Sequence, residues 1–403
     1  MNRRGKWALA FAVAGFFCLL AGSNQVLLEY VSRPDPAFKW EKRGAMPLPN
    51  GVTMHTLRLT SQQWKGIDWT HTILVAQPPK ITTSTALLLI TGGNIGSEGD
   101  SESRLIASQV ATILEAVVAV LFTVPNQPLF DNLTEDDLLA YTFVKVLETG
   151  DREWACLLPM TKSAIRAMDA VQVFCKEEIR LPIDGFVVTG ASKRGWTTWL
   201  TAVADPDRVK AIAPMVYDNL NIPAQMKHQR EVFGGYSEQI SEYTRRGLTD
   251  LATTGKARPL VELIDPFSYR DRLTVPKLII NGTNDRYWTL DAANFYFNDL
   301  PKPRYLLYVP NSGHGLEDRQ RLLHTLVGFF NGVVGRSFLP QMDWSWADEK
   351  DGAVITLKSN PTPTKVLAWT AASDTQDFRD SRWASEQVFS DGPVIRYLLK
   401  PVA

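Results

Sequence analysis

Three residue types that together carry out acyl transfer occur in this sequence in an informative order. Ser192 lies in VVTGASKRGWTTW, Asp285 in NGTNDRYW and His314 in PNSGHG. A serine hydroxyl is a weak nucleophile unless a histidine takes its proton and a carboxylate orients that histidine. The chain order serine, acid, histidine is typical of folds in which the serine follows a strand of a mostly parallel sheet. The sequence therefore predicts a Ser192–Asp285–His314 triad.

The residues around Ser192 fit a sharp turn between a strand and a helix, with one departure from the usual spacing. Gly190 and Ala191 are small, as the crowded turn requires, and a helical pattern begins directly after the serine. A second glycine usually stands two residues after the serine, but Arg194 stands there and Gly195 follows it. We expect Gly195 to relieve the packing against the next strand. The alternative is that Ser192 only caps the helix, since serine is a favoured N-cap residue.

The histidine and the acid both have competitors. A general base must lie in a loop at the strand ends to reach the serine, and His314 directly follows the last expected strand. The other histidines fall in expected strands, in a helix or in an insert: His55, His71, His324 and His228. Asp285 follows the seventh expected strand, whereas the alternative acid, Asp218, follows the sixth. A simple surface cap is a second alternative for Asp285.

Backbone donors for a developing oxyanion are expected in two places. One is the N–H of Lys193, and the other is the loop TGGN after the third strand, where Gly93 or Asn94 would donate. An ordinary tight turn is the alternative for these glycines. Four side chains near these segments are expected to contact substrate: Arg194, Tyr287, Trp288 and His228. Arg194 could pair with a substrate carboxylate, or it could form a structural ion pair instead.

The elements that must position these residues follow an alternating pattern. Apolar, β-branched runs alternate with helical segments, which predicts an α/β protein with a mostly parallel sheet and helices on both faces. Eight strands are expected, in the order of an α/β-hydrolase fold: 53–60, 69–77, 86–90, 117–124, 184–189, 209–217, 276–280 and 305–309. The main helices are expected at 103–116, 135–147, 161–174, 193–203 and 319–333. The first two strands should form an antiparallel edge.

Two regions interrupt this alternation. Residues 219–272 form a long insert between the sixth and seventh strands, and an insert there is expected to cover the site like a cap. The hydrolase-like domain is expected over residues 24–338. Beyond it, residues 339–403 contain short strand patterns at 354–357, 365–369 and 394–399, which predict a small β-sandwich-like module.

The N-terminus predicts export. Residues 1–23 combine three basic residues, the apolar run WALAFAVAGFFCLLA and small residues before Asn24, which is the pattern of a secretory signal peptide. An uncleaved N-terminal anchor is the alternative, although the run is short for a membrane span. We therefore predict a periplasmic or secreted protein with no stable membrane span after cleavage.

Composition and cysteine usage exclude several other classes. Lys and Arg number 43, as do Asp and Glu, and no clustered basic patch suggests nucleic acid. No His or Cys cluster has metal-site spacing, and GGNIGSEG matches neither a dinucleotide nor a P-loop motif, so no metal and no cofactor are expected. Cys156 and Cys175 could pair in an oxidising compartment. The helix expected between them would hold their sulfurs apart.

Several segments together resemble the PhoPQ-activated pathogenicity-related proteins, and the autocrine proliferation repressor proteins are similar. The segments are PNQPL (125–129), WACLLPMTKSAIRAMDAVQ (154–172), VTGASKRGWTTWLTA (188–202), APMVYDNLN (213–221), INGTNDRYW (280–288) and SGHG (312–315). The likeness spans roughly residues 40–400. The spacing around Ser192 also resembles the G-x-S-R-x-G of glucuronoyl esterases, whose nucleophile is likewise followed by a cation.

The resemblance implies an exported α/β-hydrolase linked to virulence and antimicrobial-peptide resistance. Together with the triad, it leads to the prediction of an exported serine hydrolase that cleaves an ester or amide. The partner expected is a small-molecule or peptide acyl substrate, and the oligomeric state is left open. The alternative is a secreted binding or signalling protein without catalysis, because autocrine relatives act as secreted signals and a fold alone does not imply an activity.

Overall fold

The computed structural model describes residues 23–389 and 392–400. The predicted signal peptide, residues 1–23, lies outside the described residues except for Ser23, which begins α1 (Ser23–Ser32). Within the described residues, none of the helices combines the length and the apolar character that a membrane crossing requires.

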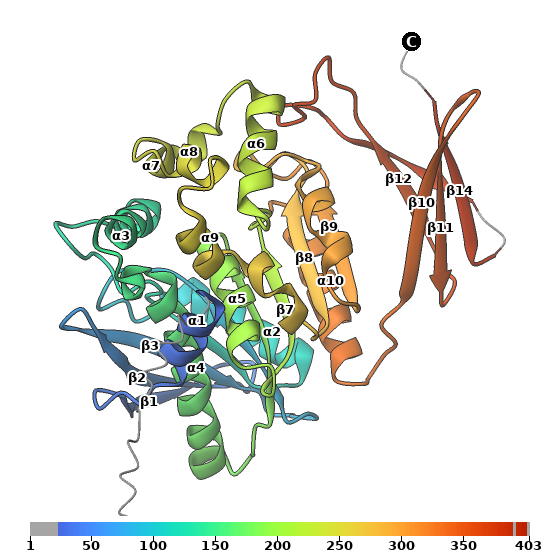
Figure 1. Ribbon diagram of the computed structural model, residues 1–403. Coiled ribbons are helices and arrows are strands. Elements are labelled where there is room, and N and C mark those ends of the chain that lie inside the picture. Colours follow the sequence, from blue (N-terminus) through green and yellow to red (C-terminus); the bar gives the residue numbers. More distant parts are fainter. Residues whose placement is uncertain (1–22, 390–391, 401–403) are drawn as a thin grey trace, which may run out of the picture.

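A mixed sheet forms the centre of the molecule (Figure 1). In the described part of the chain it contains nine strands: β1 (Lys39–Pro47), β2 (Thr53–Trp64), β3 (Ile67–Gln77), β4 (Thr85–Ile90), β5 (Val118–Leu121), β6 (Gly185–Ala191), β7 (Val209–Met215), β8 (Lys277–Gly282) and β9 (Arg304–Val309). Their order is β1-β2-β3-β5-β4-β6-β7-β8-β9. The strands from β5 to β9 pair in parallel, and β1, β2 and β3 form an antiparallel edge.

The sheet has one strand more than the eight expected, because β1 extends the antiparallel edge. Its sequence, KWEKRGAMP, is rich in charge, and nearly all of its side chains are exposed. Charged residues are usual on an edge strand, where they discourage pairing with another chain. The apolar alternation that reveals an inner strand is therefore missing from β1.

Helices cover both faces of the sheet. Besides α1, the α-helices are α2 (Ser101–Leu114), α3 (Glu135–Thr149), α4 (Leu157–Phe174), α5 (Lys193–Ala204), α6 (Ile222–Phe233), α7 (Ser241–Thr244), α8 (Leu248–Thr253), α9 (Arg258–Ile264) and α10 (Arg319–Val333). Short 3-10 and π turns complete the chain: Arg152–Trp154, Cys175–Ile179, Glu238–Ile240, Pro266–Arg272, Ala292–Phe295 and Phe297–Asp299. The helix expected from Thr161 begins earlier, at Leu157, because Pro159 is tolerated in a first helical turn.

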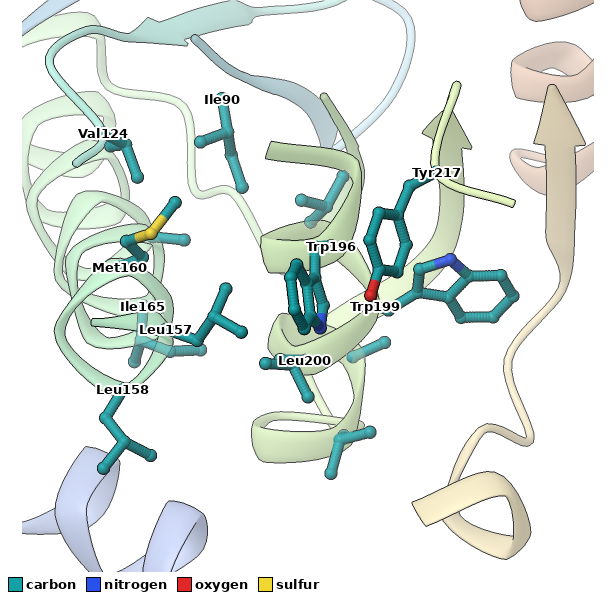
Figure 2. Close-up of a cluster of buried hydrophobic side chains, with 14 of the residues drawn as sticks. Ile90, Val124, Leu157, Leu158, Met160, Ile165, Trp196, Trp199, Leu200 and Tyr217 are labelled. Atoms are coloured by element: carbon teal, nitrogen blue, oxygen red, sulfur yellow. The ribbon is translucent and has the colours of Figure 1, made fainter. Parts of the chain in front are cut away.

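Two hydrophobic cores result, one on each face of the sheet. Along β4, Leu88 and Ile90 face the core that contains α1, α4 and α5, whereas Leu87 and Leu89 face the core under α2 and α10. This alternation follows from the two-residue period of a strand, and it explains why ALLLI is apolar throughout. Figure 2 shows part of the first core, where the rings of Trp196 and Tyr217 stack with their centroids 4.7 Å apart.

The C-terminal module, expected to be β-sandwich-like, forms two small antiparallel sheets with two strands beyond the three expected. One contains β10 (Gln341–Glu349), β11 (Gly352–Asn360) and β14 (Val394–Leu399), and the other pairs β12 (Val366–Thr370) with β13 (Ala384–Val388). Strands β10 and β13 were not expected. Both are almost entirely exposed, so their sequences carry little apolar periodicity.

Candidate active site

Ser192 occupies the sharp turn between β6 and α5, at the carboxyl edge of the parallel strands. Its backbone has φ 59° and ψ −126°, a conformation that costs a non-glycine residue roughly 1–3 kcal/mol. Its side chain makes no capping hydrogen bond to α5. The helix-cap alternative for this serine therefore finds no support, and the strained turn requires another explanation.

The glycines around Ser192 allow two segments to cross closely. A Cβ atom at Gly195 would lie 2.7 Å from the backbone oxygen of Met215 in β7, and a Cβ at Gly190 would lie 2.7 Å from the backbone oxygen of Arg194. Real Cβ contacts of this kind are essentially never this short. The displaced second glycine of G-x-S-x-x-G thus packs against the next strand, as expected from the sequence.

Asp285 and His314 lie on neighbouring loops and form a hydrogen bond. Asp285 follows β8 and His314 follows β9, and these adjacent strands bring His314 Nδ1 within 2.8 Å of Asp285 Oδ2. Asp285 is buried, and its other oxygen accepts the backbone N–H of Tyr287 at 2.9 Å. The opposite imidazole nitrogen, His314 Nε2, is buried without a hydrogen-bond partner in the described part of the chain. That nitrogen is free to exchange a proton.

Asp218 is buried away from this pair. It accepts hydrogen bonds from the phenols of Tyr296, at 2.6 Å, and Tyr308. Burial raises the pKa of Asp218 to about 7, although both tyrosine hydrogen bonds oppose the shift. Of the two candidate acids, Asp285 is therefore the one that the fold brings to the histidine.

Lys193 and Arg194 point to an acidic helix end rather than to open solvent. Lys193 Nζ lies 2.8 Å from Glu135 Oε2 and 3.0 Å from Asp136 Oδ2, at the start of α3. Both terminal nitrogens of Arg194 contact the Glu135 carboxylate at 2.7 Å, and its Nε donates to the carbonyl of Val124. Burial would raise the pKa of Glu135, but the two cations outweigh it and hold that pKa well below its usual value.

The expectation that Arg194 contacts substrate is therefore not supported, and the ion-pair alternative fits its contacts. All three guanidinium nitrogens already have protein partners, and the side chain is buried. Glu135 and Asp136 were not among the site residues predicted from the sequence. The acidic run EDD at the expected start of a helix was visible, but such runs also occur simply because they suit a helix N-terminus.

The loop after β4 contains Gly93 and Asn94, either of which was expected to donate to the oxyanion. The backbone N–H of Asn94 already donates to Ser97 Oγ at 3.1 Å, so it is not available in this arrangement. Gly93 adopts φ +109°, which other residues rarely do. Of the two residues predicted in this loop, we therefore retain Gly93.

An apolar cavity opens beside Ser192 and Lys193. About 740 Å³ of space lies between its lining atoms, and this figure includes open solvent at the mouth. Trp196 of α5 forms one wall. The insert of residues 219–272 forms much of the remainder, with Ile222, Met226, Ile240, Leu248, Leu260 and Ile264.

Of the four expected substrate contacts, two line this cavity, whereas Arg194 and His228 do not. Tyr287 and Trp288 both line it, and the Tyr287 ring also stacks on His314 with ring centroids 4.0 Å apart. The histidine thus lies at the edge of the cavity that Ser192 lines. His228 instead bonds Asp291 at 2.8 Å and packs on Phe295, outside the lining residues. The expectation that His228 contacts substrate is therefore not supported.

The remaining candidates concern metal and disulfide chemistry. Among the described residues, no group of His, Cys, Asp or Glu side chains is arranged to hold a metal ion. Cys156 and Cys175 are both buried, and neither forms a disulfide within residues 23–389 and 392–400. They lie at opposite ends of α4, and 18 residues of helix separate them by roughly 27 Å.

The strand order, with a serine turn after β6, an acid after β8 and a histidine after β9, defines an α/β-hydrolase fold. An acetyl xylan esterase from Paenibacillus sp. R4 has a similar fold, with a TM-score of 0.54 and 15% identity, over 76% of this chain and 92% of that one. Residues 27–379 match the family described as PhoPQ-activated pathogenicity-related protein, and the chain belongs to this family. Autocrine proliferation repressor protein A of Dictyostelium discoideum is 33% identical over 374 residues, which cover 88% of this chain and 75% of that protein.

Proposed function

We propose that this protein is an exported serine hydrolase that cleaves an ester or amide through Ser192, His314 and Asp285. The hydrogen bond between Asp285 and His314 Nδ1 carries the proposal, because it leaves the buried Nε2 unpaired at the edge of the cavity that Ser192 lines. Hydrogen bonds of free enzymes are often long before substrate arrives, so a Ser192–His314 bond is not required in this state.

The reaction proceeds in two halves. Ser192 Oγ attacks the carbonyl carbon while His314 Nε2 takes its proton, and Asp285 stabilises the resulting imidazolium. The N–H groups of Lys193 and Gly93 hold the oxyanion. When the tetrahedral intermediate collapses, the alcohol or amine leaves with the proton from His314. Water then gives a proton to His314 and attacks the acyl-enzyme, which releases the acid and restores the serine.

The Lys193–Arg194 pair after the nucleophile has a supporting role in this proposal. Both side chains are tied to Glu135, which anchors the first turn of α5 to the start of α3. The turn is strained at Ser192, and strain persists only where surrounding contacts hold it. We infer that this ion-pair cluster holds the nucleophile and the Lys193 N–H in position.

Residues 1–23 support export to the periplasm or out of the cell. The link to virulence and antimicrobial-peptide resistance remains what the family resemblance implies. The alternative, a secreted signalling protein without catalysis, is favoured by the name of the Dictyostelium relative, a proliferation repressor.

A fluorophosphonate probe separates the two functions, since it reacts only with an activated serine. We expect labelling of the wild type, none of Ser192→Ala, and at least a hundredfold slower labelling of Asp285→Asn. Asp218→Asn is the matched control and should label normally. A folded wild-type protein that resists the probe would favour the signalling alternative. If Asp218→Asn loses labelling and Asp285→Asn does not, Asp218 rather than Asp285 is the acid of the triad.

A further inference from the structure

Two tryptophans line the cavity beside Ser192 and direct their indole N–H groups into the protein. Trp196 donates to the carbonyl of Ile264 at 2.6 Å, and Trp288 donates to the carbonyl of Val216 at 3.2 Å. Since each N–H already has a backbone acceptor, the rings offer their carbon surfaces to the cavity. Both therefore contribute apolar wall.

Three other lining residues also keep their polar atoms away from the cavity. The side-chain oxygens of Tyr217, Asn219 and Thr249 are buried. Tyr217 faces Asn219, and Thr249 faces Tyr236 of the insert. These oxygens therefore present no polar surface to a ligand.

The two charged residues of the cavity lining neutralise each other. Asp136 and Lys193 pair at 3.0 Å, and the other carboxylate oxygen of Asp136 accepts the phenol of Tyr243 at 2.9 Å. A charged ligand group would have to disrupt this cluster or be buried without a partner, and both are costly. The insert wall is mostly aliphatic, with Leu248 and Leu260 among its residues. The cavity therefore fits a neutral hydrocarbon group.

The positions of the proposed catalytic groups indicate which part of an ester enters the cavity. Ser192 and Lys193 line it, whereas His314 and Asp285 do not. The leaving alcohol must approach His314 Nε2 to take its proton, so the alcohol lies on the histidine side of the scissile carbonyl. The acyl chain is therefore the part that extends from Ser192 into the cavity.

We propose that the cavity is an acyl pocket, which binds a neutral hydrocarbon acyl group and rejects a charged one. The proposal rests on the proposed hydrolase function and specifies its substrate class, which is the esters or amides of apolar carboxylic acids. Each methylene that enters such a pocket favours binding about fourfold, because its surface is removed from water. Of two straight acyl chains that the pocket accepts, the longer should therefore react faster.

Two pairs of esters separate the acyl side from the alcohol side. 4-Nitrophenyl hexanoate and 4-nitrophenyl acetate share a leaving group, whereas hexyl acetate and ethyl acetate share an acyl group. We expect kcat/KM to favour the hexanoate over the acetate about tenfold or more, and to differ by less than about threefold between the two alkyl acetates. The mono-4-nitrophenyl ester of adipic acid ends in a carboxylate and should react about tenfold or more slowly than the hexanoate. Equal kcat/KM for the hexanoate and the acetate, a preference confined to the alcohol pair, or equal kcat/KM for the adipate and the hexanoate would each overturn the proposal.

Ala252→Phe should lower the hexanoate-to-acetate ratio of kcat/KM about tenfold or more, because the larger side chain fills part of the pocket. Ala252 is buried in the cavity lining, on α8. Thr254→Phe, exposed at the end of the same helix and outside the lining, is the matched control and should keep the wild-type ratio. A wild-type ratio in folded Ala252→Phe would contradict the proposal. The ester comparisons use the wild type, so they decide the proposal even if Ala252→Phe fails to fold.

Binding to the Ser192→Ala protein separates this inference from the catalytic one. Trp196 and Trp288 line the cavity, so their fluorescence reports ligand binding without turnover. We expect methyl hexanoate to bind about tenfold or more tightly than methyl acetate, and monomethyl adipate to bind more weakly than methyl hexanoate. Equal binding of all three esters would overturn the proposal. Selective binding of methyl hexanoate, without hydrolysis of any ester by the wild type, would instead retain the pocket and reject the hydrolase.

Discussion

At the scale of single residues, the two buried aspartates Asp285 and Asp218 differ in their hydrogen-bond partners. Asp285 accepts hydrogen bonds from His314 Nδ1 and from a backbone N–H, whereas Asp218 accepts hydrogen bonds from two phenols. Burial raises the pKa of Asp218 to about 7 from its ordinary value of 3.8. Between pH 3.8 and about pH 7, Asp218 keeps its proton in the folded protein but loses it in the unfolded chain. Raising the pH through this window therefore destabilises the fold.

Asp218→Asn should remove this pH dependence. Since the amide carries no titrating proton, the variant should gain stability relative to the wild type as the pH rises from 4 to 8, on the order of 3 kcal/mol. Guanidinium unfolding at pH 4.5 and pH 8 measures the change, and Asp68→Asn, at an exposed position, is the control. Parallel stability curves for wild type and Asp218→Asn would contradict the prediction.

At the scale of elements, the turn between β6 and α5 depends on the close approach of α5 to β7. Gly195 makes that approach possible, because the atom a side chain would meet is the backbone oxygen of Met215, which cannot rotate away. A helix that shifted to admit a methyl group would also move Ser192 and the Lys193 N–H. The same contact therefore serves both packing and the proposed chemistry.

Gly195→Ala should destabilise the protein by about 1–3 kcal/mol and slow fluorophosphonate labelling of the folded fraction. Gly328→Ala is the matched control, and its effect on stability should have the opposite sign. Gly328 is exposed within α10 and has open space around it, so alanine there should stabilise by about 0.5–1 kcal/mol. Thermal melts of both variants give the comparison. Equal shifts for the two substitutions would show that backbone crowding at Gly195 is unimportant.

At the scale of the whole molecule, the C-terminal module touches the loops of the proposed triad. A clamp loop, residues 371–383, connects β12 and β13. Asn284, directly before Asp285, donates its amide to the backbone oxygens of Phe378, Arg379 and Ser381, the shortest at 2.7 Å. Asn311, three residues before His314, exchanges two hydrogen bonds with the backbone of Trp383 at 2.9 and 2.8 Å.

The clamp loop also reaches the insert (Figure 1). Glu238 of the insert accepts from Arg379 at 3.0 Å and from Arg286 of the acid loop at 2.9 Å, and the Arg379 guanidinium lies 3.8 Å over the ring of Phe233 in α6. One segment thus joins the acid loop, the histidine loop and the insert. Such a connection favours a module that supports the site over an independent appendage.

Asn284→Asp should lower kcat about tenfold or more while KM changes little. The carboxylate has the shape of the amide but would face three carbonyl oxygens without a proton to donate, and small displacements of Asp285 are costly for catalysis. Steady-state ester hydrolysis gives kcat and KM, with the enzyme concentration corrected for the measured folded fraction. Asn311→Asp should also lower kcat, because the variant loses the hydrogen bond to the Trp383 carbonyl.

Arg396→Ala is the control for the module, because it breaks an exposed ion pair with Glu349 away from the clamp loop. It should leave kcat and KM unchanged. If both asparagine variants fold and retain the wild-type kcat, the clamp loop has no influence on the proposed triad.

Local sequence was sufficient to predict most inner strands of this protein and the positions of the three triad candidates. Short, fully apolar runs such as ALLLI favour strands buried on both faces, and their alternation with helical segments leaves few topologies. Ser192, Asp285 and His314 were each placed by the strand that precedes them, since parallel strands end at a common edge. Exposed strands such as β1, β10 and β13 escaped prediction, because without a buried face they have no apolar alternation.

Only the tertiary structure decided which partner each polar side chain has. Arg194 meets Glu135, His228 meets Asp291, and Asp285 rather than Asp218 meets His314, across separations of 29 to 63 residues. No periodicity encodes such pairs, because they depend on how whole elements pack. The same holds for the contacts of the clamp loop with Asn284 and Asn311. Sequence order determined where the chemistry could occur, and packing determined which groups remain free to perform it.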